Sequence, residues 1–244
     1  MVVISRACVY MNLKFPLLFT CLASFISLLP VQVSANGMVP ETSVVVVEEE
    51  DGEGVITVKN TDAFAVLMLT TLENIKGDEE TLLAITPPAA RVEPGKTQSV
   101  RFILTNKEPL KTERLKRVIF EGVPPQKMGK NEVRISVRQN LPVIIRPAGL
   151  EKDLAPWKRL TWTLKGNDLT VSNPSPYVVR LGDSVQTVPD NSQWMLPNSY
   201  VLPGQTLTVS TKGNQHAGKA RQVRISPATT WGYTVESYDA ELSN

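Results

Sequence analysis

Val133–Ile145 has the sequence VRISVRQNLPVII, thirteen residues without a glycine that together form one strand pattern. Its first half alternates strictly, so Val133, Ile135 and Val137 share one face and the residues between them share the other. Typical strands have about five or six residues, and this segment is more than twice as long. It predicts either a long edge strand whose apolar row completes the protein's own core, or a strand that lends its backbone and apolar row to another protein.

Shorter strand patterns precede this segment. They cover residues 44–47, 54–58, 65–70, 99–104 and 117–120. Turn signals such as Asp51-Gly52 and Glu93-Pro94-Gly95 separate them. Residues 62–74 and 108–116 could pass for helices, but we interpret both as strands or strand ends. Strands at this spacing predict an immunoglobulin-like β-sandwich.

A second sandwich is predicted after Arg146-Pro147. Residues 160–164 and 169–172 flank a turn at 165–168, which is typical of a hairpin. Later strand patterns cover 177–181, 206–209, 221–225 and 233–237. The four tryptophans of this half are expected to fill or border its core, with a sugar-binding platform as the alternative: Trp157, Trp162, Trp194 and Trp231. The predicted fold class is therefore all-β, with two sandwich domains at 36–147 and 148–244 held at a fixed angle by a short proline-containing connection.

Residues 1–35 are interpreted as a signal peptide. Arg6 and Lys14 accompany an uncharged apolar run over 15–29, and Val33-Ser34-Ala35 offers the small residues that cleavage near Ala35 requires. A membrane anchor is the alternative, but about 15 apolar residues fall short of the roughly 20 that span a bilayer. The sequence therefore predicts export.

Both cysteines, Cys8 and Cys21, lie within this segment. Cys21 also suggests a lipid-attachment site, which we disfavour because Thr20 is too large for that motif. Removal of 35 of the 244 residues leaves a mature chain of 209 residues without cysteine. Its stability then depends on packing, with no disulfide.

The charge balance gives no indication of nucleic-acid binding. The chain has 26 basic and 24 acidic residues, and the loss of Arg6 and Lys14 would leave it neutral. One basic run stands out, but acids interrupt it and no aromatic residues alternate with it, so we interpret it as a solvated strand face: Lys107, Lys111, Arg114, Lys116 and Arg117.

Few residues could support catalysis or metal binding. His216 is the only histidine, in a polar loop, so no histidine-based triad or zinc site is expected. The acidic run 48–51 lacks the alternating ligand spacing of a calcium loop. We therefore expect no enzymatic activity, no cofactor and no metal.

Four blocks of the sequence resemble the periplasmic chaperones of the chaperone-usher pathway, which escort pilus subunits. They are residues 86–102 (Thr86-Pro87-Pro88 through Val100-Arg101-Phe102), Val123-Pro124-Pro125, Leu141 to Pro147 with its Arg-Pro end, and Asn173 to Val179. The resemblance covers the whole mature chain. It implies two immunoglobulin-like sandwiches in an L-shaped arrangement and donation of a β-strand to the subunit. Strand addition between a chaperone and a pilin is an established mode of peptide recognition.

The resemblance also assigns residues. It places the donor row on Val133, Ile135 and Val137. It further implies a buried charge pair of Glu113 and Arg146 near the domain junction, and the third member of that network has no clear match in the sequence.

The sequence departs from the family at the subunit's C-terminal carboxylate. Pro142 stands where the family usually has the lysine that binds this carboxylate, and the partner arginine of the first strand has no match. Arg138 or Arg134 could take this role. The usual disulfide of the second domain is also absent, which indicates a divergent branch.

The expected partners are pilus subunits and an outer-membrane usher, in the periplasm, and the free protein could dimerise to cover its own edge. Two other functions stay open: a two-domain structural pilin or adhesin, and a secreted carbohydrate-binding protein. A pilin would carry its own donor extension after the signal peptide, and residues 36–40 are too short for one.

Overall fold

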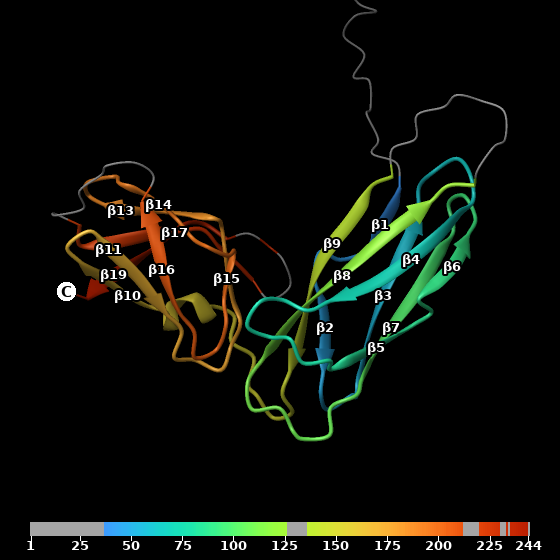
Figure 1. Ribbon diagram of the computed structural model, residues 1–244, viewed down its shortest axis with the longest axis horizontal. Coiled ribbons are helices and arrows are strands. Elements are labelled where there is room, and N and C mark those ends of the chain that lie inside the picture. Colours follow the sequence, from blue (N-terminus) through green and yellow to red (C-terminus); the bar gives the residue numbers. More distant parts are fainter. Residues whose placement is uncertain (1–36, 126–135, 212–219, 230–232, 234, 244) are drawn as a thin grey trace, which may run out of the picture. The chain divides into compact units, whose positions relative to one another are not determined.

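The computed structural model describes residues 37–125, 136–211, 220–229, 233 and 235–243 (Figure 1). The regular secondary structure of these residues is almost entirely β-strand, and the helical element among them is one short 3₁₀ helix, η1 (Pro156–Arg159). The predicted all-β class is confirmed. Within the described ranges there is no helix with the length and hydrophobicity needed to span a bilayer. The predicted signal peptide, residues 1–35, lies outside them.

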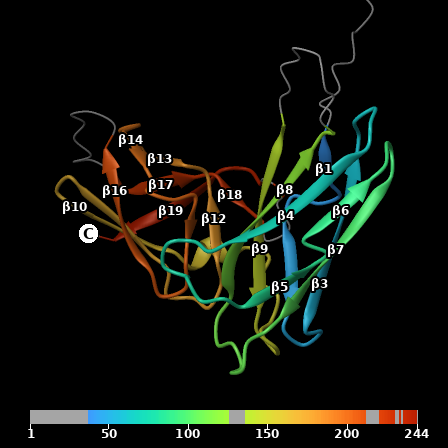
Figure 2. The same ribbon diagram turned by 45° about the vertical axis from the view of Figure 1, so that its right-hand side comes forward.

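Nine strands form the first sandwich. Their hydrogen-bonded order is β5-β7-β3-β2-β9-β8-β4-β6, with β1 paired to β3 (Figures 1 and 2). Strand β2 pairs with β9 in parallel and thereby joins the two layers. The strands are β1 (Met38–Pro40), β2 (Val45–Glu48), β3 (Glu53–Asn60), β4 (Val66–Glu73), β5 (Leu83–Thr86), β6 (Ala89–Val92), β7 (Thr97–Leu104), β8 (Arg114–Val123) and β9 (Arg138–Arg146).

The core of this sandwich follows from the alternation of its strands. In β3, every second side chain is buried, including Ile56 and Val58. Phe102, Phe120 and Val143 from β7, β8 and β9 are fully buried in the same cluster. Each such side chain contributes about 1.5–3 kcal/mol when it leaves water. Period-two alternation therefore predicts this core well.

Two glycines allow the turn between β2 and β3. Gly52 has φ +69°, a left-handed conformation that favours glycine, as the Asp51-Gly52 turn signal predicts. A Cβ at Gly54 would lie 2.6 Å from the carbonyl oxygen of Val46. Glycine at this position therefore lets β3 approach β2 closely.

The second sandwich has a ring of strands and a smaller sheet. The closed order is β10-β11-β16-β14-β13-β17-β19, and the three-stranded sheet has the order β15-β12-β18. The strands are β10 (Thr161–Lys165), β11 (Asp168–Ser172), β12 (Val179–Leu181), β13 (Ser184–Val188), β14 (Gln193–Met195), β15 (Tyr200–Val201), β16 (Thr206–Thr211), β17 (Gln222–Ile225), β18 (Pro227–Ala228) and β19 (Tyr238–Ser243). The hairpin predicted around residues 165–168 is confirmed by the β10–β11 pairing.

Tryptophans fill the second core. Trp162 and Trp194 are fully buried, and Trp157 is 7% exposed. The expectation that these three belong to the core is confirmed, which argues against a sugar platform built from them. Trp231 lies outside the described residues.

Two strand predictions differ from the structure. The pattern at 233–237 predicts a strand, but the described residues of this range are not in one, and β19 begins at Tyr238. The long strand predicted from Val133 begins at Arg138, so Ser136 and Val137 precede it.

The second difference follows from pairing rather than from the sequence pattern. The β8–β9 ladder ends at the Glu121–Arg138 pair, although β8 itself continues to Val123 in its pairing with β4. A strand pattern shows that a segment can be extended, whereas a paired strand also requires backbone partners.

Candidate functional site

The edge of β9 is the first component of the site. Residues Arg138–Pro142 pair with β8 on one side, whereas β2 pairs only with Val143–Arg146 on the other. Within the described residues, the 138–142 segment thus has no second strand partner (Figure 2). Such an edge offers free N–H and C=O groups to an added strand.

The side chains on the core-facing side of β9 become exposed toward the start of the strand. Leu141, Val143 and Ile145 face the first sandwich's core, and Leu141 is 7% exposed. Gln139, the preceding residue on this side, is polar and partly exposed, and Val137, which directly precedes β9, is 44% exposed. The described part of the predicted donor row is therefore accessible. Val133 and Ile135 lie outside the described residues.

Of the two predicted carboxylate anchors, the structure describes Arg138. Its Nε lies 2.8 Å from Oε2 of Glu121, and its side chain is 65% exposed. The Ser136 hydroxyl also donates to Glu121, at 3.2 Å. Arg138 is thus already paired with an acid, which does not favour it as an anchor. Arg134 lies outside the described residues.

Glu113 and Arg146 form a buried ion pair at the junction of the two sandwiches. Arg146 Nε lies 3.2 Å from Glu113 Oε1, and the side chains are 4% and 2% exposed. The other carboxylate oxygen accepts the Val178 N–H at 2.8 Å, and the Glu113 N–H donates to the Pro176 carbonyl at 2.8 Å. The structure therefore brings together the two residues that the resemblance paired.

Glu48 is an acid of this network that sequence reasoning missed. Arg146 Nη1 lies 3.0 Å from Glu48 Oε1, and the two residues are partners in the parallel β2–β9 pairing. Burial raises the pKa of the Glu113 carboxyl above 4.5, although the Val178 amide and Arg146 act to lower it and Glu48 adds to the rise. Arg146 is therefore a shared counterion of Glu113 and Glu48.

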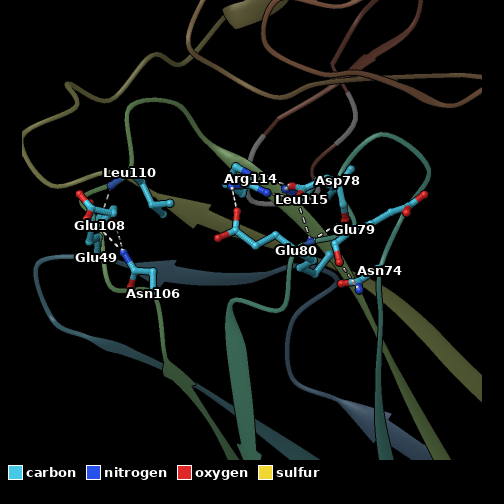
Figure 3. Close-up of polar contacts among 11 residues, drawn as sticks. Glu49, Asn74, Asp78, Glu79, Glu80, Asn106, Glu108, Leu110, Arg114 and Leu115 are labelled. Carbon is cyan, nitrogen blue, oxygen red and sulfur yellow. Dashed lines mark hydrogen bonds and ion pairs between the residues drawn. The ribbon is translucent and has the colours of Figure 1, made fainter.

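A second buried charge cluster surrounds Asp78. Lys116 Nζ lies 2.8 Å from Asp78 Oδ1, and Arg114 Nε donates to Oδ2 at 2.9 Å (Figure 3). The Leu115 N–H also donates to Oδ2, at 3.2 Å. Burial acts to raise the pKa of Asp78, but the hydrogen bonds of Arg114 and Lys116 outweigh it and hold the pKa below 3.8.

This cluster corrects the interpretation of the basic run as a solvated face. Lys116 is 3% exposed and Arg114 is half-buried, whereas Lys107 and Lys111 are exposed as predicted. The spacing of charges along the sequence did not indicate that Lys116 is buried, because its partner Asp78 lies in a loop 38 residues away.

Glu49 ties two loops to the connection between the sandwiches. Its carboxylate accepts hydrogen bonds from Asn106 Nδ2 at 2.8 Å and from the Leu110 N–H at 2.9 Å (Figure 3). It also accepts one from the Ala148 N–H at 2.9 Å. Burial acts to raise the pKa of Glu49, but these donors lower it overall. Within the acidic run, Glu48 thus contacts Arg146 and Glu49 contacts Ala148, on either side of Pro147.

The described residues contain no group of three or more His, Cys, Asp or Glu side chains that could hold a metal ion. His216 lies outside them.

Comparison with known proteins agrees with this architecture. Two family models match the chain: the N-terminal domain of the PapD pili and flagellar-assembly chaperones over residues 37–151, and the C-terminal domain of the PapD pili-assembly chaperones over residues 155–238. The chain belongs to the pilus-assembly chaperone family. Its two sandwiches are the immunoglobulin-like domains of that family.

Individual relatives support the same assignment. The chain is 41% identical over 209 residues to the uncharacterized fimbrial chaperone YhcA of Escherichia coli K12, a match that covers 85% of this chain and 92% of the relative. It is 29% identical over 169 residues to the chaperone protein LpfB of Salmonella typhimurium, covering 66% and 72%.

Solved structures show the same fold. A chain of the Salmonella enterica complex of SafA pilin with the SafB chaperone has a TM-score of 0.69 at 19% identity, covering 86% of this chain and 98% of that one. The CupB2 chaperone of Pseudomonas aeruginosa has a TM-score of 0.66 at 23% identity, covering 84% and 100%.

Proposed function

We propose that this chain is a periplasmic chaperone that binds pilus subunits by donating the β9 edge and delivers them to an outer-membrane usher. One observation carries the proposal: among the described residues Arg138–Pro142 has no second strand partner, and Val137, which directly precedes this segment on the core-facing side, is an exposed apolar residue. Membership in the pilus-assembly chaperone family supports it. Residues 1–35 would be the export signal, and 36–147 and 148–244 the two domains.

The binding would be physical rather than chemical. A pilus subunit that lacks its last strand exposes an apolar groove and unpaired backbone groups, which favour aggregation. The row Val133, Ile135 and Val137 would fill this groove, with each aliphatic side chain contributing about 1.5–3 kcal/mol when fully buried. Backbone hydrogen bonds from the β9 edge would add about 0.5–1.5 kcal/mol each. Neither contribution requires a nucleotide or a metal.

Glu113 and Arg146 would have a structural part in this function. Their buried pair connects β9 to the Val178 amide of the second sandwich. We propose that it keeps both sandwiches in place while a subunit is bound.

Two substitutions on the same β9 row test the proposal. Val137→Asp should leave folding intact, because this side chain is 44% exposed, but should abolish capture of a co-expressed cognate subunit. Leu141→Asp is the matched control for a core position: at 7% exposure, it should unfold the free protein.

Thermal unfolding of each free variant and the yield of co-purified subunit are the two measurements. A folded Val137→Asp variant that still retains its subunit would contradict donation by this strand. The oligomeric state of the free wild type, from light scattering, would test whether a second copy covers the same edge.

A further inference from the structure

Three polar side chains at the start of β9 are bonded to β8. Arg138 Nε lies 2.8 Å from Glu121 Oε2, and the hydroxyl of Ser136, just before the strand, donates to Glu121 Oε1 at 3.2 Å. Arg117 Nε donates to Asn140 Oδ1 at 2.7 Å. Successive side chains of a strand point to opposite sides, so residues 136, 138 and 140 share the side away from the core. Each of them already has a partner within the chain.

Gln139 lies on the opposite, core-facing side of β9. Its partner across the β8–β9 ladder is Phe120, which is fully buried in the first core. The side chains of directly opposed residues lie on the same side of a sheet. Gln139 is nevertheless partly exposed, and its side-chain amide has no hydrogen-bond partner among the described residues. In this part of the strand, it is therefore the polar side chain that remains available to a binding partner.

Gln139 stands at the boundary between the protein's own core and the proposed donor row. Leu141, the next residue on its side, is 7% exposed, whereas Val137, the previous one, is 44% exposed. A subunit whose groove takes up Val137 and the row before it would therefore also cover Gln139. A carboxamide has two N–H donors and a carbonyl acceptor. Burial of these groups without partners is unfavourable, so the covering surface has to supply hydrogen bonds.

The surroundings of Gln139 indicate a neutral partner. The described residues that flank it on the same side of β9 are aliphatic, namely Val137 and Leu141. Arg138, the adjacent cation in the sequence, lies on the other side and is bound to Glu121. A charged subunit side chain against Gln139 would thus be buried without a counterion, which is costly. A hydroxyl or carboxamide side chain can donate and accept hydrogen bonds without one.

A polar pair at this single position would also fix the register of the donated strand. In the predicted row Val133, Ile135 and Val137, an aliphatic residue recurs at every second position. A slip of two residues would still place aliphatic side chains in most of the groove. The same slip would break a hydrogen-bonded polar pair, as a single buried polar residue specifies register in coiled coils.

We infer that Gln139 selects the subunit: its carboxamide binds a hydroxyl or carboxamide side chain of the subunit groove and thereby sets the register of the donated strand. The inference rests on the proposed function and adds the chemistry of the partner. The aliphatic row supplies affinity, whereas Gln139 supplies specificity, because its amide would stay unpaired against a groove that is apolar at this position.

Competition between two chaperones for one subunit tests the inference. Wild type and Gln139→Met, which is similar in size but has no amide, carry different tags and are co-expressed with a cognate subunit. The wild type should hold about ten times more subunit, which corresponds to about 1.4 kcal/mol. This is the scale of one buried polar group that loses its partner. Equal shares would overturn the inference.

Gln98 on β7 provides the matched control. It is also a partly exposed glutamine, and it lies opposite the buried Val58 across the β3–β7 ladder. Gln98→Met should change the share of bound subunit by less than about twofold. A loss as large as that of Gln139→Met would show a general effect of the substitution and overturn the inference.

Two further measurements separate recognition from a structural role. The melting temperature of free Gln139→Met should be no lower than that of the wild type, because the lost amide has no partner in the described part of the chain. A lower value would assign Gln139 to the protein's own stability. Gln139→Glu should lose at least as much subunit as Gln139→Met, because a covered carboxylate lacks a counterion. Full capture by Gln139→Glu would show that the subunit leaves this position uncovered.

The subunit supplies the last arm. Each serine, threonine, asparagine and glutamine of its groove is replaced in turn by alanine. One replacement should lower capture by the wild type about tenfold and capture by Gln139→Met less than about twofold, which is the coupling expected of a contacting pair. Additive losses at every position would overturn the inference.

Failure of the inference is distinguishable from failure of the proposed function. A wild type that captures no subunit would overturn both. A wild type that captures its subunit, with Val137→Asp unable to do so and Gln139→Met unchanged, would overturn the inference alone.

Discussion

Two buried carboxylates of the first sandwich, Asp78 and Glu113, have opposite pKa shifts. Their side chains are almost equally buried, at 4% and 2% exposure. Asp78 is paired with two cations, Arg114 and Lys116, of which Arg114 also contacts Glu80, and the pKa of Asp78 is lowered. Glu113 has the single cation Arg146, which it shares with Glu48, and its pKa is raised. The number of cations paired with each carboxylate, together with burial, sets the direction of its shift.

The difference also separates two structural roles. The Asp78 cluster joins a loop to β8 inside one sandwich. The Glu113 cluster joins the first sandwich to the Val178 amide of the second. Asp78 can lose one of its two cations and keep the other, whereas Glu113 has one cation to lose.

The largest expected effect comes from the Glu113 cluster, which has one cation. Arg146→Ala leaves Glu113 without its counterion and also removes the partner of Glu48. We expect a loss of about 3–5 kcal/mol in the free energy of unfolding, measured in urea. Arg101→Ala, which breaks only an exposed pair, should cost less than about 1 kcal/mol. Similar urea midpoints for the two variants would show that Arg146 is not an essential counterion.

A smaller loss is expected in the Asp78 cluster. Lys116→Met removes one cation and its two hydrogen bonds to Asp78, but Asp78 keeps Arg114 and the Leu115 N–H. The cost should stay below about 2 kcal/mol, because the loss of these hydrogen bonds is partly offset by no longer burying the ammonium group. If Lys116→Met destabilises the protein as much as Arg146→Ala, the number of cations paired with each carboxylate does not explain the contrast.

The pH dependence of Glu113 should have the sign of a raised pKa. The folded protein then holds the proton of Glu113 more tightly than the unfolded chain does. The contribution of Glu113 to the free energy of unfolding is fully present below pH 4.5 and is lost as the pH rises through the raised folded pKa. Relative to Glu113→Gln, the wild type should therefore lose stability over this window, as followed by urea midpoints at successive pH values.

Asp78 should show the opposite sign. Its lowered pKa contributes stability that is present above pH 3.8 and lost as the pH falls through the folded pKa. Relative to Asp78→Asn, the wild type should lose stability in acid below about pH 4. If both carboxylates change the stability in the same direction as the pH rises, their pKa shifts are not opposite.

Much of the fold could be predicted because β-structure leaves a local pattern. Period-two alternation and turn residues indicated the hairpin at 161–172, most strands of the first sandwich and the buried tryptophans. The four motif blocks carried the family resemblance. Within the site, the resemblance paired Glu113 with Arg146, which lie 33 residues apart in the chain.

What only the tertiary structure decided is pairing. The strand pattern of Val133–Ile145 does not reveal that its ladder with β8 ends at Arg138, or that β2 leaves the edge free up to Pro142. A basic run looks the same whether its lysine is solvated or buried on an aspartate from a distant loop, as Lys116 is. Leu115 and Ile144 of the first sandwich are buried in one cluster with Val178 and Leu202 of the second, which no local pattern indicates. Backbone periodicity is a property of neighbouring residues, whereas hydrogen-bond partners and counterions depend on which distant segments the folded chain brings together.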